Sequence, residues 1–180
     1  MRSYASDADV ASSGPASAGL ALRPAVPGDA EAIAAVWHAG WADGHLGHVP
    51  DALAAHRRLD DFRRRVPARL PETTVAVAGG RVVGFVMLHG DEVEQVYVAR
   101  DARGTGAADA LLARGEEEVA RRAPVAWLAV APGNARARRF YERNGWTDAG
   151  PFDYAAEVEG GTMVVPCRRY VKRVARVAGC

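Results

Sequence analysis

A glycine-rich turn is the part of this chain whose residue types most directly suggest chemistry. Residues 103–108 read Arg-Gly-Thr-Gly-Ala-Ala, between an apolar run and a segment with helical periodicity. The first N–H groups of a helix have no partner inside the helix, and the helix dipole adds positive charge there. Gly104 and Gly106 have no Cβ to keep an anion away from the backbone. The pattern predicts an anion site made of backbone N–H groups, with the charge of Arg103 beside it.

Two other phosphate-binding motifs fit this turn less well. A P-loop requires Lys and then Ser or Thr directly after its second glycine, whereas Ala107 and Ala108 follow Gly106. A dinucleotide-binding fingerprint requires a third glycine, and Asp109 occupies that position. The segment after the next expected strand also lacks the acidic residue that would bind a ribose. These departures argue against a dinucleotide-dependent oxidoreductase.

The turn resembles the pyrophosphate loop of the GCN5-related N-acetyltransferase (GNAT) family. Arg103, Gly106 and Ala108 take defined positions of that loop, and the family's pattern allows alanine at the last of them. Residues 134–146, Asn-Ala-Arg-Ala-Arg-Arg-Phe-Tyr-Glu-Arg-Asn-Gly-Trp, are similar to a second signature of the family. The resemblance covers roughly residues 20–175, and the two signatures together are much more specific than the loop alone.

The resemblance implies a fold and a co-substrate. The fold is α/β (α+β), with a mixed, mostly antiparallel central sheet of six to seven strands, about four flanking helices, and strands four and five splayed apart. The co-substrate is acetyl-CoA, whose arm would pair with backbone groups of Val96 and Val98 as an added strand does. The implied contacts with acetyl-CoA are Val96, Tyr97, Val98, Arg103, Gly104, Thr105, Gly106, Ala107, Ala108, Asn134, Ala137 and Tyr141.

Some of these residues also have an ordinary structural explanation, which stays open. Val96 and Val98 also fit a core strand, and Asn134 also fits the N-cap of a helix. The resemblance implies that Tyr141 is the general acid that protonates the departing thiolate. Periodicity alone favours a half-buried aromatic residue at that position, beside Phe140.

Transfer of an acyl group to an amine also requires a proton acceptor. Glu94 lies two residues before Val96, so a strand would place both side chains on the same side. A carboxylate in a partly dry cleft has a raised pKa and can accept a proton from an ammonium group. Glu94 is therefore the expected base. Glu92, His89 and Asp153 remain alternatives, and a solvated turn explains the acidic residues around Glu94 equally well.

The segment of residues 37–50 carries two tryptophans and three histidines. We expect it to line the mouth of the acceptor pocket, with Trp41 stacking on the substrate and Trp37 anchored in the core. No cysteine or cluster of acids lies near these histidines, so no metal site is predicted. The expected pocket residues are Trp41, His45, Glu94 and Asp153.

The composition restricts the class of partner. The net charge of +1 over 180 residues gives no overall basic field for nucleic acid. Basic runs at residues 57–65 and 136–140 are interpreted as solvated helix faces. No apolar run approaches the ~20 residues that span a bilayer, and the N-terminus lacks the plan of a secretory signal. We therefore expect a cytoplasmic protein that contacts neither nucleic acid nor membrane.

The order of elements is mixed. After a first strand come two helices, a three-stranded meander, a helix, a strand, a helix and a final hairpin. The second helix is expected from about residue 51 to 65, ended by Pro67 and Pro71, and the final hairpin turns at Gly160-Gly161.

Residues 1–19 are rich in Ala, Ser and Gly and predict a disordered tail. Residues 20–176 are expected to form a single acyltransferase domain, and residues 177–180 a frayed end.

Two classes of function remain. The first is an N-acetyltransferase that moves an acetyl group from acetyl-CoA to a primary amine, on a small molecule or a peptide, by direct attack in a ternary complex. The second is a non-catalytic module of the same fold that binds or senses acyl-CoA. The general pattern of the family also leads us to expect a homodimer.

Overall fold

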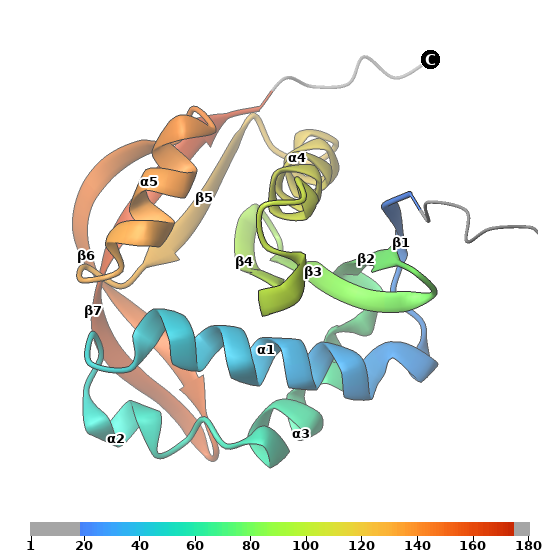
Figure 1. Ribbon diagram of the computed structural model, residues 1–180. Coiled ribbons are helices and arrows are strands. Elements are labelled where there is room, and N and C mark those ends of the chain that lie inside the picture. Colours follow the sequence, from blue (N-terminus) through green and yellow to red (C-terminus); the bar gives the residue numbers. More distant parts are fainter. Residues whose placement is uncertain (1–18, 175–180) are drawn as a thin grey trace, which may run out of the picture.

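The computed structural model describes residues 19–174. Within them lie seven strands and five α-helices (Figure 1). The strands are β1 (Ala21–Pro24), β2 (Thr73–Ala78), β3 (Arg81–His89), β4 (Glu92–Val98), β5 (Val125–Val130), β6 (Thr147–Val158) and β7 (Gly161–Arg173). The helices are α1 (Ala30–His45), α2 (Asp51–Ala54), α3 (Leu59–Arg69), α4 (Ala107–Ala120) and α5 (Ala135–Arg143). The tail expected at residues 1–19, apart from Gly19, and the frayed end expected at 177–180 lie outside the described residues.

All strands belong to one sheet with the order β1-β2-β3-β4-β5-β7-β6. Every neighbouring pair is antiparallel except β4 and β5, which run parallel. The only paired residues between β4 and β5 are Glu92 and Trp127, and the Trp127 N–H donates to the carbonyl of Asp91 at 3.1 Å. Past this point the two strands diverge. The predicted mixed, mostly antiparallel sheet with splayed fourth and fifth strands is confirmed.

Side chains of β3 alternate between the two faces of the sheet. Phe85 and Met87 are fully buried in a cluster with residues of α1 and α3. Val86 and Leu88 are buried in a second cluster with residues of α4. This alternation follows from the two-residue repeat of a strand, and it places α1 and α4 on opposite faces of the sheet (Figure 1).

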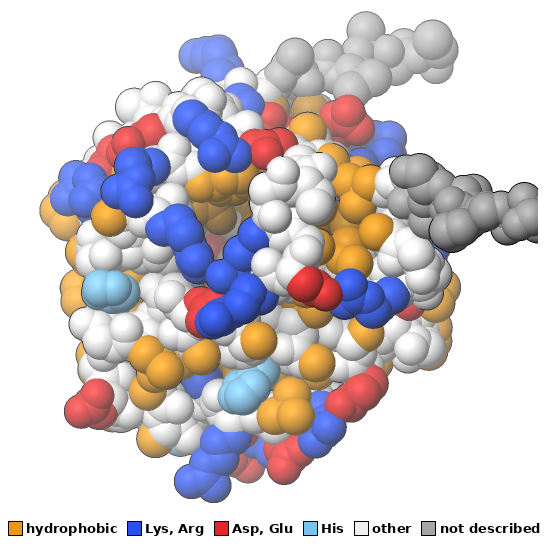
Figure 2. Space-filling model, viewed as in Figure 1, with side chains coloured by type: hydrophobic (Ala, Val, Ile, Leu, Met, Phe, Trp, Pro, Cys, Tyr) orange, Lys and Arg blue, Asp and Glu red, His pale blue; other side chains and the backbone are white. Residues whose placement is uncertain are grey.

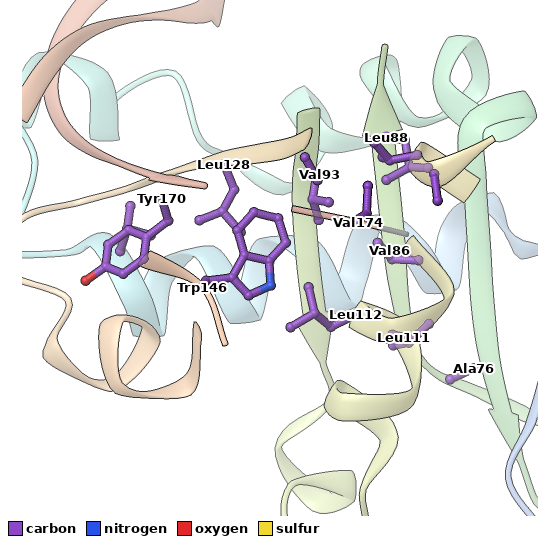
Figure 3. Close-up of a cluster of buried hydrophobic side chains, with 14 of the residues drawn as sticks. Ala76, Val86, Leu88, Val93, Leu111, Leu112, Leu128, Trp146, Tyr170 and Val174 are labelled. Carbon is purple, nitrogen blue, oxygen red and sulfur yellow. The ribbon is translucent and has the colours of Figure 1, made fainter. Parts of the chain in front are cut away.

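The second cluster continues from α4 to the neighbourhood of α5. Figure 3 shows Leu111 and Leu112 of α4 against the strands, Trp146 beside Leu128, and Tyr170 farther from α4. Large buried side chains on both sides of the divergent strands keep the sheet continuous where its backbone pairing is interrupted.

The expectation of one helix over residues 51–65 is wrong. The structure has two helices there, α2 and α3, because the chain turns between Ala54 and Leu59. The Asp61 carboxylate accepts the backbone N–H of Arg58 at 2.7 Å and so starts a new helix. Pro67 lies inside α3 instead of ending it.

None of the helices within residues 19–174 combines the length and the apolar character that a bilayer crossing requires.

Candidate functional site

One cavity of about 1530 Å³ connects most of the candidate residues. It extends from the loop before α4, along β4 and α5, to α1, α3 and the β6–β7 hairpin. Figure 2 shows a hollow between α4 and α5 with a hydrophobic floor and with Lys and Arg side chains at its rim. The volume exceeds the range of about 300–1000 Å³ typical of a pocket for one small ligand. The cavity has room for two molecules.

The glycine-rich loop presents backbone donors at one end of this cavity. Gly104 and Gly106 have φ angles of 78° and 86°, a left-handed conformation that favours glycine. No side chain of the described residues caps the start of α4. Within the described residues, no protein acceptor bonds the N–H groups of Gly104, Thr105 or Gly106. A Cβ placed on either glycine would have no atom within 4 Å, so the protein leaves open space beside the backbone at both positions.

Other members of the loop contribute differently. The Thr105 hydroxyl donates to the carbonyl of Ala102 at 2.7 Å, and the Ala107 side chain is fully buried. Neither side chain lines the cavity, so these two residues offer only backbone groups. Arg103 does line the cavity, and its guanidinium is paired with Asp43 of α1 at 2.6 Å. Asp43 also pairs with Arg100 at 2.9 Å.

Strand β4 forms one wall of the cavity with Val96, Tyr97 and Val98. The side chains of Val96 and Val98 pack against the core cluster under α4. Beyond Glu92, no residue of β4 is paired with β5. Val96 and Val98 therefore pack into the core through their side chains, while the backbone edge that faces β5 is left unpaired.

Helix α5 brings Asn134, Ala137 and Tyr141 to the cavity. The Asn134 side chain accepts the N–H of Ala137 at 3.0 Å, so Asn134 is the N-cap of α5. The Tyr141 ring lies 5.2 Å from that of Phe140 and 6.0 Å from that of Trp146. Burial raises the pKa of Tyr141 above its usual value. The hydroxyl therefore keeps its proton at neutral pH and can donate it.

Two glutamates at the start of β4 line the cavity. Glu94 is the extra residue of a β-bulge, because the register of β3 shifts between Met87 and Leu88. Its carboxylate forms an ion pair with Arg69. Glu92 is 6% exposed, and burial raises its pKa to about 7, with a smaller contribution from the charge of Glu94. This raised pKa makes Glu92 a candidate proton acceptor near neutral pH.

The far end of the cavity contains the expected acceptor residues. Trp41, His45 and Asp153 line it, as does His89. The Trp41 and His45 rings stack in parallel at 4.9 Å, so the protein itself covers one face of Trp41. Burial lowers the pKa of His45 to about 4, which keeps the ring neutral. Within residues 19–174, no three His, Cys, Asp or Glu side chains cluster in a way that could hold a metal ion.

Sequence reasoning missed the arginines of the acceptor end. The run 57–65 was expected to be a solvated face, but Arg57 is only 8% exposed, and both Arg57 and Arg65 line the cavity. A signal was available on α3. Arg65 and Arg69 recur with Phe62 and Val66 at a spacing of three and four residues, so all four lie on the buried helix face.

Comparison with solved structures shows the same architecture. A GCN5-related N-acetyltransferase from Rhodopseudomonas palustris is 23% identical with a TM-score of 0.67, covering 89% of this chain and 99% of its own. YncA from Salmonella typhimurium, solved with its cofactor acetyl-CoA, is 20% identical with a TM-score of 0.63, covering 90% and 98%. PaiA N-acetyltransferase from Thermoplasma acidophilum, solved with coenzyme A, is 14% identical with a TM-score of 0.59, covering 86% and 99%. No curated protein matches the chain.

A family model extends the agreement from fold to sequence. The model of the acetyltransferase (GNAT) family matches residues 37–146, more than half of the chain. This range includes the glycine-rich loop, β4, and α5 with Tyr141. The chain belongs to the GNAT family of acetyltransferases.

Proposed function

We propose that this protein is an acetyl-CoA-dependent N-acetyltransferase that acetylates a primary amine by direct attack within a ternary complex. The observation that carries the proposal is the open set of N–H donors at residues 104–106. These donors lie at the same cavity as the β4 wall and Tyr141. An anion site, an unpaired strand edge and a proton donor around one cavity are the parts that such a transfer needs.

The end of the cavity at the glycine-rich loop, here called the donor end, fits acetyl-CoA, the donor of the acetyl group. Acetyl-CoA supplies an activated acetyl thioester when it is bound. The N–H groups of residues 104–106, with those of Ala107 and Ala108 at the start of α4, would bind its diphosphate. The backbone of Val96 and Val98 would pair with the amides of its arm, since β5 leaves that edge unpaired. Asn134 would combine its observed cap with a contact to the same arm.

Two side chains would move the protons of the reaction. The amine nitrogen bonds to the carbonyl carbon as the carbon–sulfur bond breaks. We assign to Tyr141 the proton that the leaving thiolate accepts. As the amide forms, its nitrogen releases a proton, which restores the Tyr141 hydroxyl. We assign to Glu92 the proton that the acceptor ammonium loses before the attack, because Glu92 is buried and forms no ion pair within residues 19–174, whereas Glu94 is held by Arg69. In this proposal Glu94, the base expected from the sequence, positions Arg69.

The first test is thermal denaturation with acetyl-CoA and, in parallel, with NAD. A ligand present at 100 times its dissociation constant stabilises a protein by about 2.7 kcal/mol. We expect acetyl-CoA to raise the melting temperature and NAD to leave it unchanged. Stabilisation by NAD alone would refute the proposal.

The second test is release of free thiol from acetyl-CoA with a panel of primary amines. We expect amine-dependent release above the rate of hydrolysis. Stabilisation by acetyl-CoA without release for any amine would identify a non-catalytic acyl-CoA-binding module instead.

Self-association and location belong to the same proposal. We propose a homodimer in the cytoplasm, which sedimentation equilibrium and cell fractionation test. A monomeric mass at all concentrations would contradict the dimer.

A further inference from the structure

The acceptor end of the cavity is lined by three arginines from one stretch of chain. Arg57 lies between α2 and α3, and Arg65 and Arg69 lie on α3. Arg57 is 8% exposed, and the side chains of Arg65 and Arg69 are 16% and 20% exposed. Arginine is rarely this buried unless its charge is paired. What balances these charges decides what this end of the cavity can bind.

Two of the arginines have carboxylate partners inside the protein. Arg69 pairs with Glu94, which is itself largely buried. Arg65 pairs with Glu157 at 3.1 Å, but the Glu157 side chain is 60% exposed. Water screens an exposed carboxylate strongly, so this pair offsets little of the charge of Arg65.

Arg57 has no carboxylate partner within 4 Å among the described residues. Its two terminal nitrogens donate to the backbone carbonyls of His56 at 2.9 Å and Glu157 at 2.8 Å, which are neutral acceptors. Burial, and then the charge of Arg65, lower the pKa of Arg57 to about 10, so it stays charged at neutral pH. A buried charge without a counter-ion is strongly unfavourable. An anion entering the cavity would offset it.

Unused hydrogen-bond donors accompany this charge. The Nε groups of Arg65 and Arg69 are buried and have no hydrogen-bond partner within the described residues. The Arg65 guanidinium lies 4.7 Å from the Trp37 ring centre, and that of Arg57 lies 5.7 Å from the Trp41 ring centre. Cation–π contacts hold guanidinium groups against aromatic rings without occupying their N–H groups. Two donors of the cluster therefore have no acceptor among the described residues.

The lowered pKa of His45 is consistent with a positive field at this end. His45 also lines the cavity, and burial is the main cause of its lowered pKa, with the charge of Arg57 adding to the effect. The positive charge here therefore comes from arginines and does not change near neutral pH.

We propose that the acceptor carries a carboxylate in addition to its primary amine, and that Arg57 and Arg65 bind this carboxylate. The inference rests on the proposed function, because it specifies the acceptor of the same site. Guanidinium groups present forked N–H donors that match the two oxygens of a carboxylate. Glu92, at the start of β4, lines the same cavity and receives the proton of the amine. The acceptor class is thus a small amino acid.

Matched substrates test this inference. Thiol release from acetyl-CoA is measured with the standard amino acids and with their carboxamides, which keep the amine and lack the carboxylate. Hydrogen bonds to a charged group predict that kcat/KM for the best amino acid exceeds that for its carboxamide by at least about 10-fold. Equal values for the two would overturn the inference.

Variants of Arg57 and Arg65 then test whether these residues distinguish amino acids from their carboxamides. In Arg57→Gln we expect KM for the amino acid to rise by about 10-fold or more, with KM for the carboxamide unchanged. Arg65→Gln should act in the same direction. Arg57→Lys, which keeps the charge but loses the fork, should give an intermediate loss and serves if Arg57→Gln does not fold. Arg58→Gln is the matched control, because Arg58 is the exposed neighbour. An equal loss for both substrates in folded Arg57→Gln or Arg57→Lys would overturn the inference.

A binding measurement separates this inference from the proposed function. If no amine releases thiol, the proposed function fails, and the carboxylate site is tested by thermal shift of the coenzyme A-loaded protein with N-acetyl amino acids and their carboxamides. Stronger stabilisation by the acids, reduced in Arg57→Lys, supports the site. Equal stabilisation refutes it.

Discussion

Burial has the same effect on two residues of the cavity, which have opposite roles in the proposed reaction. It raises the pKa of Tyr141 and of Glu92 because it disfavours the charged form of each. For Tyr141 the result is a hydroxyl that holds its proton until a stronger base, such as a thiolate, forms beside it. For Glu92 the pKa of about 7 allows a carboxylate that is a strong enough base to deprotonate an ammonium group.

Replacing Tyr141 by Phe removes only the hydroxyl. General acid catalysis contributes roughly 10²- to 10⁴-fold, so we expect kcat to fall by about that factor. The ring contacts with Phe140 and Trp146 remain, so stabilisation by acetyl-CoA should not change. Stopped-flow thiol release and thermal denaturation measure the two effects. An unchanged kcat would show that another group protonates the thiolate.

Replacing Glu92 by Gln removes the group that titrates near neutrality. In the wild type, kcat/KM should rise with pH through about pH 7 as Glu92 loses its proton. In Glu92→Gln this rise should disappear and the rate should fall by about 10²-fold. Glu94→Gln is the comparison, because it frees Arg69 yet leaves Glu92 in place. A rise near pH 7 that Glu92→Gln keeps and Glu94→Gln loses would reverse the assignment.

At the scale of elements, the loop before α4 depends on its left-handed glycines. An alanine in the left-handed conformation is unfavourable by about 1–2 kcal/mol, so Gly106→Ala should strain the loop or turn its N–H groups. We expect the dissociation constant for acetyl-CoA to rise by about 10-fold, measured by calorimetry.

Gly160→Ala is the control for the loop. Gly160 has a similar φ of 83° and open space around it in the β6–β7 turn. This variant should lower the melting temperature by a similar amount while leaving the acetyl-CoA affinity unchanged. Equal affinities in both variants would show that the loop does not bind the diphosphate.

Helix α1 approaches β4 through a glycine. A Cβ at Gly40 would lie 2.3 Å from Cδ1 of Tyr97, so Gly40→Ala must displace either the ring or the helix. Overpacking of this kind lowers the free energy of unfolding by about 1–3 kcal/mol, and denaturant titration measures it. Gly28→Ala meets no atom within 4 Å and should change stability little. A neutral Gly40→Ala would mean that α1 shifts freely against the sheet.

Local signals explain which elements the sequence predicts. The hairpin at Gly79-Gly80 and the loop at Gly104 and Gly106 each need a left-handed backbone, and glycine marks these positions directly. The break between α2 and α3 has no glycine to mark it. The Asp61 carboxylate, which accepts the Arg58 N–H and starts α3, is a weaker mark, because aspartate is equally common within the first turn of a continuing helix.

At the scale of the molecule, the acceptor end joins segments that are distant in sequence. The Glu157 carbonyl that accepts from Arg57 lies 100 positions further along the chain. The burial of Arg57 could not be predicted from its own neighbourhood, since the final hairpin covers it. The donor end could be predicted, because a single continuous stretch from β4 to α4 supplies most of it.

The dependence of stability on pH is a property of the whole chain to which two cavity residues contribute with opposite sign. Burial lowers the pKa of His45 from 6.5 to about 4. The unfolded chain then binds more protons in this range, so stability is lost as pH falls from 6.5 toward 4. Burial raises the pKa of Glu92 from 4.5 to about 7. The folded state then binds more protons, so stability is lost as pH rises from 4.5 toward 7.

The two contributions partly cancel in the wild type, and single variants expose them. In His45→Gln, the melting temperature should fall less than in the wild type as the pH is lowered from about 6.5 to 5. In Glu92→Gln, it should fall less than in the wild type as the pH is raised from about 5 to 7. Calorimetry across this range measures both. The same slope in both variants and in the wild type would show that neither residue is perturbed on folding.

Asp43 on α1 is paired with Arg103, beside the proposed diphosphate site. A bound diphosphate would compete with Asp43 for that guanidinium, and α1 also carries Trp41 and His45 toward the acceptor. Binding of acetyl-CoA would thus break the ion pair between Asp43 of α1 and Arg103, and α1 also lines the acceptor end. The affinity for the amine would then depend on whether acetyl-CoA is bound, and the reverse. A dissociation constant for acetyl-CoA that changes when the amine is bound, measured by calorimetry, is the signature of this coupling, and Asp43→Asn should weaken it.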